Sequence, residues 1–173
     1  MKNDEIEKIQ FGHWPMPEVF LTELGRLVVI WSSLENFLDM VLTKLAGLDI
    51  YDPRGLILFT HLSMPQKLDA LGALGEQLAP EHPNLNALPE SIAKLRAAQK
   101  LRNDLIHNAL TYSSEDGHLE MPVGTARGKL KAEVRKVSLV DIKRAVVEIS
   151  TAQRHLYKVV FKREISHPWE TSV

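Results

Sequence analysis

Cysteine is absent from the sequence. The chain therefore has no disulfide framework, no thiol nucleophile and no thiolate ligand for a metal. It also lacks the G-x-S-x-G elbow of serine hydrolases and the G-x-x-x-x-G-K-[ST] loop that holds nucleotide phosphates. Seven histidines are present, but no two of them have the i,i+4 spacing of a zinc site on a helix. The sequence thus gives no support for a serine triad or a bound metal, and we expect no cofactor.

A long apolar run is also missing. A helix that spans a bilayer needs about 18 or more consecutive apolar residues, whereas the most apolar stretch, Leu24 to Leu45, is interrupted by charged and polar residues. The first ten residues are acidic and polar, unlike a secretory signal peptide. The length of 173 residues and the 45% apolar and 25% charged fractions suit one globular domain. These properties predict a cytoplasmic protein with no membrane contact.

The net charge of −1 conceals an uneven distribution of charge along the chain. Residues 1–126 contain 10 lysines and arginines against 17 acidic residues, whereas residues 127–163 contain 11 against 3. A basic block of this kind can attract a polyanion such as RNA through the release of counterions. It can equally be a solvated surface whose cations pair with nearby carboxylates. The sequence leaves these two interpretations open.

Helical periodicity dominates the sequence. Pro17 and Gly47 bound the first long amphipathic segment, since proline suits the first turn of a helix and glycine commonly follows its end. Capping-box patterns that begin at Ser63 and Ser138 open two further helices. The predicted helices run from about Pro17 to Gly47, from Pro53 to Thr60, from Ser63 to Leu78, from Pro89 through His107, and from Ser138 through Val160.

Between residues 109 and 137 the apolar period changes to that of a strand. Alternating segments around Leu110–Tyr112 and His118–Met121 flank a turn at Ser114–Gly117, and Lys129–Val137 alternates again. We therefore predict a mainly α fold: an up-and-down bundle of four to five helices with a small β hairpin or three-stranded insertion before the last helix. A single domain over residues 17–165 contains this insertion at about 109–137, and residues 1–16 and 166–173 are tails.

The stretch Arg102-Asn103-Asp104-Leu105-Ile106-His107 places an arginine and a histidine five residues apart within a predicted helix. Arginine can grip a phosphate through two hydrogen bonds, and histidine can transfer a proton near neutral pH. At about 100° per residue, Asn103 and His107 share a face, so Asn103 can orient the imidazole. Arg102 lies about 140° from His107 and near the centre of the apolar stripe. We therefore expect the two side chains to point in different directions, with Arg102 toward the core.

Glu35 is a second charge on an otherwise apolar stripe. It lies in the first long helix within the series Val28, Trp31, Leu38 and Leu42. Because a buried charge without a partner is strongly destabilising, Glu35 is predicted to pair with Arg102 between packed helices. This pair could hold the guanidinium so that its outer edge meets a phosphate, or it could serve only to fix the register of the bundle.

The same residues resemble a known family. Arg102-Asn103-Asp104-Leu105-Ile106-His107 resembles the Arg-polar-x-x-x-His signature of the HEPN superfamily, which is named for higher eukaryotes and prokaryotes nucleotide-binding. Trp31-Ser32-Ser33-Leu34-Glu35 and Lys67-Leu68 are similar to its stand-alone bacterial members. The resemblance covers residues 17–110; the last helix fits it, and the β insertion is a local elaboration. It implies a helical homodimer in which two copies of the motif face each other across a twofold axis.

The resemblance also implies a metal-independent ribonuclease, often found in toxin–antitoxin or phage-defence settings. Arg102 would stabilise the phosphate, His107 would act as general acid or base on the 2′-hydroxyl or the leaving oxygen, and Asn103 would support the site. RNA and an antitoxin protein are the implied partners. Some HEPN members bind without catalysis, and the string also resembles the mannitol operon repressor family. A non-catalytic regulator or nucleotide- or RNA-binding module is therefore the alternative, and a structural dimer in which Arg102 and His107 only pack is a third hypothesis.

Overall fold

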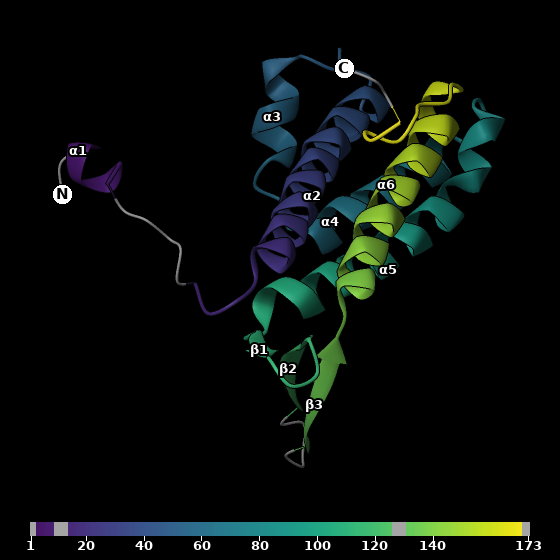
Figure 1. The fold of residues 1–173 in the computed structure, drawn as a ribbon. Coiled ribbons are helices and arrows are strands. Elements are labelled where there is room, and N and C mark those ends of the chain that lie inside the picture. The colour runs from purple at the N-terminus through teal and green to yellow at the C-terminus, as the bar shows by residue number, and fades with distance from the viewer. Residues whose placement is uncertain (1–2, 9–13, 126–130, 171–173) are drawn as a thin grey trace.

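The protein is mainly helical, with a three-stranded antiparallel sheet inserted before the last helix (Figure 1). The structure is a computed structural model that describes residues 3–8, 14–125 and 131–170. Its elements are α1 (Asn3–Ile6), α2 (Glu18–Leu45), α3 (Pro53–Phe59), α4 (Met64–Leu78), the 3-10 helix η1 (Pro83–Ala87), α5 (Leu88–His107), β1 (Thr111–Ser113), β2 (His118–Thr125), β3 (Lys131–Val137) and α6 (Leu139–Phe161). The predicted fold class is confirmed.

Four long helices enclose the core. α2 packs against α4 and α6, and α5 packs against the same two helices, while α3 lies on the outside against α2. Leucine side chains from all four long helices are completely buried between them, and each contributes about 1.5–3 kcal/mol to stability by leaving water. The fully buried leucines include Leu27, Leu34, Leu38, Leu68, Leu71, Leu95 and Leu156.

Local signals in the sequence account for most of the helix boundaries. α2 ends where Gly47 adopts a φ of 80°, a conformation that glycine tolerates best. The N–H of Gly47 donates to the carbonyl of Lys44 and that of Leu48 to the carbonyl of Thr43, each at 3.1 Å. This pair of hydrogen bonds is the Schellman arrangement, which satisfies carbonyls left open at the helix end. The glycine in the sequence therefore predicted the end of α2 correctly.

Both predicted capping boxes are also present. The N–H of Ser63 donates to Gln66 Oε1 at the start of α4, and the N–H of Ser138 donates to Asp141 Oδ2 at the start of α6, each at 2.9 Å. α5 begins at Leu88, one residue before the predicted proline. The short helix η1 lies between the predicted helices that end at Leu78 and begin at Pro89, where no element was predicted.

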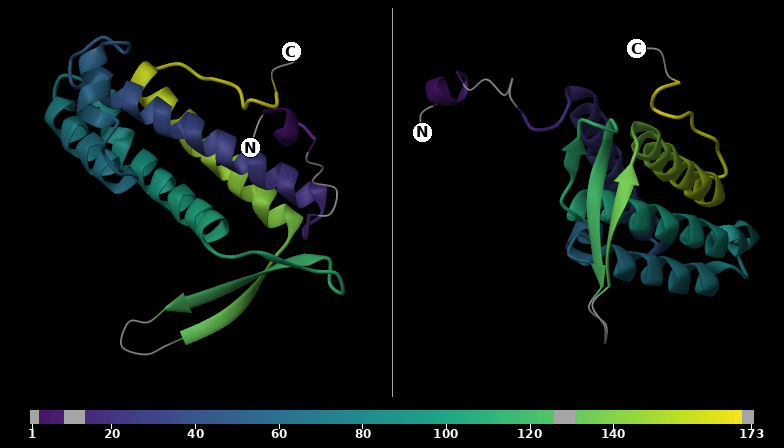
Figure 2. Two further views of the ribbon diagram at one scale, coloured as in Figure 1. Left: turned by 90° about the vertical axis from the view of Figure 1, so that its left-hand side faces the viewer. Right: turned by 60° about the horizontal axis from the view of Figure 1, so that its bottom comes forward.

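The sheet has the strand order β1-β2-β3 and lies at the end of the bundle where α5 ends and α6 begins (Figures 1 and 2). Gly117, with a φ of 69°, forms the predicted turn between β1 and β2, and its N–H donates to the carbonyl of Ser113 at 2.9 Å. Leu119 pairs with Val137 across β2 and β3, and both are buried. One face of the sheet is thus anchored in the core, and this brings the hairpin beside α5.

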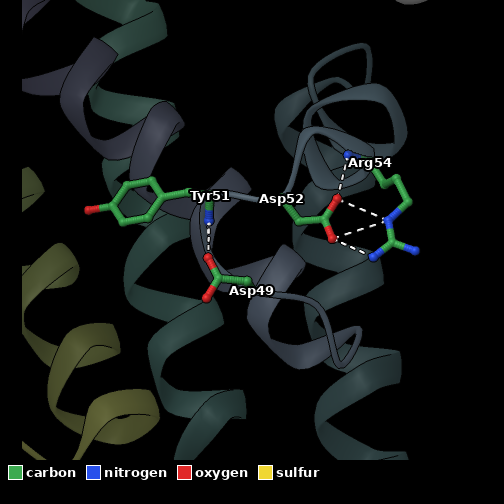
Figure 3. A network of polar contacts seen from close by, with 4 residues as sticks. All are labelled: Asp49, Tyr51, Asp52 and Arg54. Atoms are coloured by element: carbon green, nitrogen blue, oxygen red, sulfur yellow. Dashed lines mark hydrogen bonds and ion pairs between the residues drawn. The ribbon is translucent and has the colours of Figure 1, made fainter.

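The N-terminus of α3 is capped by Asp52, which is held by Arg54 (Figure 3). The Asp52 carboxylate accepts hydrogen bonds from the Arg54 backbone N–H at 2.9 Å and from Arg54 Nε and Nη2 at 3.0 and 2.5 Å. Just before it, Asp49 accepts a hydrogen bond from the N–H of Tyr51 at 3.0 Å. The hydrogen bonds from the Arg54 side chain and backbone lower the pKa of Asp52 from 3.8 to about 2. The charged form of the cap is therefore the favoured one.

The capping of α3 should weaken only in strong acid. Because the pKa of Asp52 is lower in the folded state, its stabilising contribution is complete above the ordinary value of 3.8 and is lost as the pH falls through about 2. An NMR titration of the Asp52 carboxyl should therefore have its midpoint at about 2. Arg54→Gln should move the midpoint back toward 3.8. Equal midpoints in the two proteins would show that the Arg54 contact does not persist in solution.

Candidate functional site

The last two turns of α5 carry the motif residues Arg102, Asn103 and His107. α5 ends at His107 because Asn108 adopts an extended backbone, with a ψ of 150°. The Asn108 side chain folds back, and its Nδ2 donates to the carbonyl of Asp104 at 2.8 Å. This hydrogen bond satisfies one of the carbonyls that a helix end leaves open. His107 is thereby fixed at the exposed end of the helix.

Arg102 reaches His107 along the helix. Arg102 Nη1 lies 2.7 Å from His107 Nε2, and it also donates to Asn103 Oδ1 at 3.2 Å. The expectation that the two side chains point in different directions was wrong. Five residues advance a helix by only about 7.5 Å, a distance that a long arginine side chain can cover from a different starting direction. The three motif residues form one connected polar group.

The contact with Arg102 defines the tautomer of His107. A guanidinium has only N–H donors, so His107 Nε2 accepts the hydrogen bond. This hydrogen bond requires the tautomer that carries its proton on Nδ1. Once a phosphate oxygen takes the place of Nε2 as acceptor for Arg102, the released nitrogen can accept a proton from a hydroxyl group.

Arg102 rests on a buried tryptophan. Its Cζ lies 5.5 Å from the centroid of the Trp31 ring on α2, and Trp31 is only 3% exposed. Arg102 itself is half-buried, and its Nε is buried without a hydrogen-bond partner. The face of the Trp31 ring attracts the cationic guanidinium of Arg102 and holds it in place. As expected from the apolar stripe, Arg102 lies toward the core, while its Nη1 is directed to His107.

Glu35 does not make the predicted contact. Among the described residues, no ion pair joins Glu35 to Arg102, and the guanidinium meets Trp31, Asn103 and His107 instead. The prediction failed because Glu35 is half-buried rather than buried, so its carboxylate does not need a partner inside the bundle. A supporting role for Glu35 in the site stays a prediction.

Asp39 on α2 and Lys67 on α4 form a buried ion pair in the bundle. Lys67 Nζ lies 2.5 Å from Asp39 Oδ1, and the two side chains are 7% and 10% exposed. The contact is an ion pair without the alignment of a hydrogen bond at Oδ1. The sequence contained a signal for a buried acid at this position. Asp39 lies four residues after Glu35, about one helical turn, and therefore on the same apolar stripe. The sequence therefore indicated a buried acid on this side of α2, but the predicted acid and its predicted partner were both wrong, since Asp39 pairs with Lys67 on α4.

The Arg102–His107 group lies at the surface rather than in a deep cavity. His107 is exposed, and Arg102 and Asn103 are half-buried. A cavity of about 940 Å³ lies elsewhere, between the segment Trp14–Pro17, the start of α2 and Tyr112. An open site of this kind needs a second surface to exclude water from a reacting phosphate.

A serine–histidine–glutamate chain joins α5 to α6. Ser91 Oγ lies 2.8 Å from His155 Nδ1, and His155 Nε2 lies 3.5 Å from Glu90 Oε1. The arrangement contains the residue types of a hydrolytic triad, but Ser91 is completely buried. Its hydroxyl cannot reach a substrate, so the chain links two helices and does not form a second active site.

Five cations of the basic block are paired with nearby carboxylates. The hydrogen bonds from Lys136 and Lys158 hold the pKa values of Asp116 and Glu164 below their ordinary values. The pairs are Arg135–Glu133, Lys136–Asp116, Lys143–Glu23, Arg144–Asp141 and Lys158–Glu164. Such pairs are typical of a solvated surface, and Arg127 and Lys129 lie outside the described residues.

Three comparisons and two structural features bear on the class of the protein. No protein-family model, no curated protein and no solved structure matches the chain. Within the described ranges, no three histidine, aspartate or glutamate side chains gather in a way that could hold a metal ion. None of the described helices is both long and apolar enough to pass through a bilayer. The chemistry of the Arg102–His107 group is therefore the main indication of function.

Proposed function

We propose that this protein is a metal-independent endoribonuclease of the HEPN type, in which Arg102 and His107 act on one phosphodiester in the cleft of a homodimer. The observation that carries the proposal is the 2.7 Å contact between Arg102 Nη1 and His107 Nε2. It brings a phosphate-binding cation and a proton-transferring group close enough to act on the same phosphodiester. A toxin or phage-defence role, with an antitoxin as partner, belongs to the same proposal and rests on the resemblance to HEPN proteins.

The geometry supports internal attack by the ribose 2′-hydroxyl. In this reaction the 2′-oxygen bonds to phosphorus, the bond from phosphorus to the 5′-oxygen breaks, and a 2′,3′-cyclic phosphate and a 5′-hydroxyl result. His107 takes the proton of the 2′-hydroxyl, and the imidazolium so formed delivers that proton to the departing 5′-oxygen. Arg102 neutralises the charge that grows on the non-bridging oxygens, and Asn103 and the Trp31 ring hold its guanidinium in place. The 2′-hydroxyl makes RNA, and not DNA, the substrate.

The side of α2 next to Trp31 supports the homodimer. Val28 and Val29 are 44% and 71% exposed, and Gly25 and Ser32 on the same side are exposed as well. An exposed surface with apolar side chains close together favours contact with another protein. A twofold contact here would place two Arg102–His107 groups beside one cleft and supply the second surface that the open site needs.

Incubation of the purified protein with single-stranded RNA in the presence of EDTA tests the proposed reaction. We expect cleavage, products that end in a 2′,3′-cyclic phosphate, and no cleavage of the same sequence made of DNA. Binding without cleavage would support the non-catalytic alternative. Absence of both binding and cleavage would leave Arg102 and His107 as a packing feature.

The homodimer is tested by Val29→Asp. The substitution would bury one carboxylate from each subunit in the interface, against the other carboxylate or against apolar groups. The dissociation constant of the dimer should therefore rise at least tenfold. Analytical ultracentrifugation over a concentration series measures the change. Val147→Asp is the matched control, because Val147 is an exposed valine on α6. A wild-type protein that sediments as a monomer at every concentration contradicts the dimer directly.

A further inference from the structure

Burial identifies the face of the β2–β3 hairpin that turns toward the bundle. In the register of the two strands, Leu119 is the partner of Val137 and Met121 is the partner of Arg135. Leu119, Met121 and Val137 are buried, so their face packs on the helices. Because side chains alternate along a strand, Arg135 shares this face with Val137. Arg135 is exposed although its partner Met121 is buried, so Arg135 lies at the solvent-facing edge of this face.

Arg135 reaches the helix that carries the Arg102–His107 group. Its Nη1 lies 3.8 Å from Asp104 Oδ2 on α5, and its Nε donates to Glu133 Oε1 at 2.6 Å. Asp104 precedes His107 by three residues, so the two are neighbours on the helix surface, with Cβ atoms about 5–6 Å apart. Figure 2 shows the hairpin beside the end of the bundle at which α5 ends. Since the Arg135 side chain is 50% exposed, its guanidinium can donate to a further acceptor beside His107.

We propose that Arg135 is a substrate-binding residue that holds the phosphate next to the one cleaved and directs a single RNA strand from the Arg102–His107 group onto the hairpin. This role rests on the proposed function, which gives the position of the cleaved phosphate. Glu133 orients the guanidinium in advance, so a phosphate oxygen meets a cation whose direction is already set. The β insertion would then be part of the substrate path.

Asp104 makes the proposal more specific. Its carboxylate lies near the same guanidinium and carries the same sign of charge as a phosphate. A bound RNA strand must therefore compete with Asp104 for Arg135. Removal of the Arg135 charge should weaken RNA binding, whereas removal of the Asp104 charge should strengthen it.

Lys136 provides a matched control for Arg135. It is the next residue of β3, so it points to the opposite face of the hairpin, where it pairs with Asp116. Lys136→Gln and Arg135→Gln remove the same charge from the same strand. A general effect of net charge on RNA binding would appear equally in both variants, while a phosphate contact would appear only in Arg135→Gln.

Fluorescence anisotropy with a labelled single-stranded RNA, in the His107→Ala background so that the strand stays intact, measures the binding across a salt series. We expect Arg135→Gln to weaken binding by roughly three- to tenfold at low salt and to reduce the slope of log K against log salt by about 0.7, the value for one contact to a single strand. Asp104→Asn should tighten binding and Lys136→Gln should leave the slope unchanged.

The outcomes separate this role from the proposed reaction. If the wild type cleaves RNA but Arg135→Gln and Lys136→Gln bind with the same slope, the role of Arg135 is overturned while the nuclease stands. If the wild type binds RNA through Arg135 without cutting it, the nuclease fails and the binding role stands. A protein that binds no RNA at any salt concentration overturns both.

Discussion

Replacing His107 by alanine is expected to slow RNA cleavage by roughly 10²- to 10⁴-fold, the usual contribution of a positioned general acid or base. The imidazole is the group in the site that can take up and release a proton near neutral pH, and alanine offers no substitute. The fold should not change, because His107 is exposed at the last position of α5. Single-turnover cleavage of a labelled RNA gives the rate, and thermal unfolding checks that the variant is intact.

Two further variants show whether His107 acts together with Arg102. Arg102→Gln should slow cleavage by roughly 10²- to 10³-fold, as the loss of one donor to a developing charge commonly does. The double variant should be little slower than the slower single variant, because in the proposed reaction both residues act on one phosphate as a unit. His82→Ala is the control, since His82 is an exposed histidine just before η1. Equal rates for His82→Ala and His107→Ala would assign the cleavage to another site or to a contaminating nuclease.

Replacing Lys67 by alanine is expected to lower the free energy of unfolding by about 3–5 kcal/mol, the cost of breaking a buried ion pair from one side. The carboxylate of Asp39 would remain in the core, where it is 10% exposed and loses the ammonium at 2.5 Å. For a domain of this length, each kcal/mol corresponds to about 2–4 °C in Tm. Thermal and urea unfolding should therefore show a fall of roughly 6–20 °C.

The matched double variant gives the opposite result. Asp39→Leu combined with Lys67→Met removes both charges and keeps apolar volume, so it should be as stable as the wild type or more stable. Lys94→Ala is the control for the loss of an ordinary lysine, because its pair with Glu90 lies at the surface and should leave Tm nearly unchanged. If Lys67→Ala and Lys94→Ala unfold at the same temperature, Asp39 and Lys67 do not form a buried pair in solution.

Helix boundaries were predictable because the signals that set them act over a few residues. Gly47 ends α2 through its positive φ, and Ser63 and Ser138 start α4 and α6 through hydrogen bonds to residues three positions away. The turn at Gly117 follows from the same kind of local preference. The 3-10 helix η1 was not predicted. The boundaries that were predicted depend on backbone preferences that a sequence displays directly.

The candidate site was predictable only in part. Arg102, Asn103 and His107 were identified because they lie within six consecutive residues of one helix. Their contact was not, since the angular positions of Cα atoms say little about where a long, flexible side chain ends. Glu35 was predicted to form the ion pair between helices, whereas Asp39 forms one, with Lys67. A periodic pattern locates the stripe that faces the core, but the neighbouring helices determine which residue along the stripe is covered.

The sequence by itself determined the elements of this protein: the helical bundle, the place of the β insertion and the presence of an arginine and a histidine near the end of one helix. Tertiary structure alone decided that Arg102 rests on Trp31, that Asp39 pairs with Lys67, and that Arg135 from the insertion reaches Asp104 beside His107. Elements follow from preferences between near neighbours in the chain. Contacts between helices, and between the hairpin and α5, depend on which surfaces become buried by residues that are distant in sequence. Only the packing of the whole chain determines this burial.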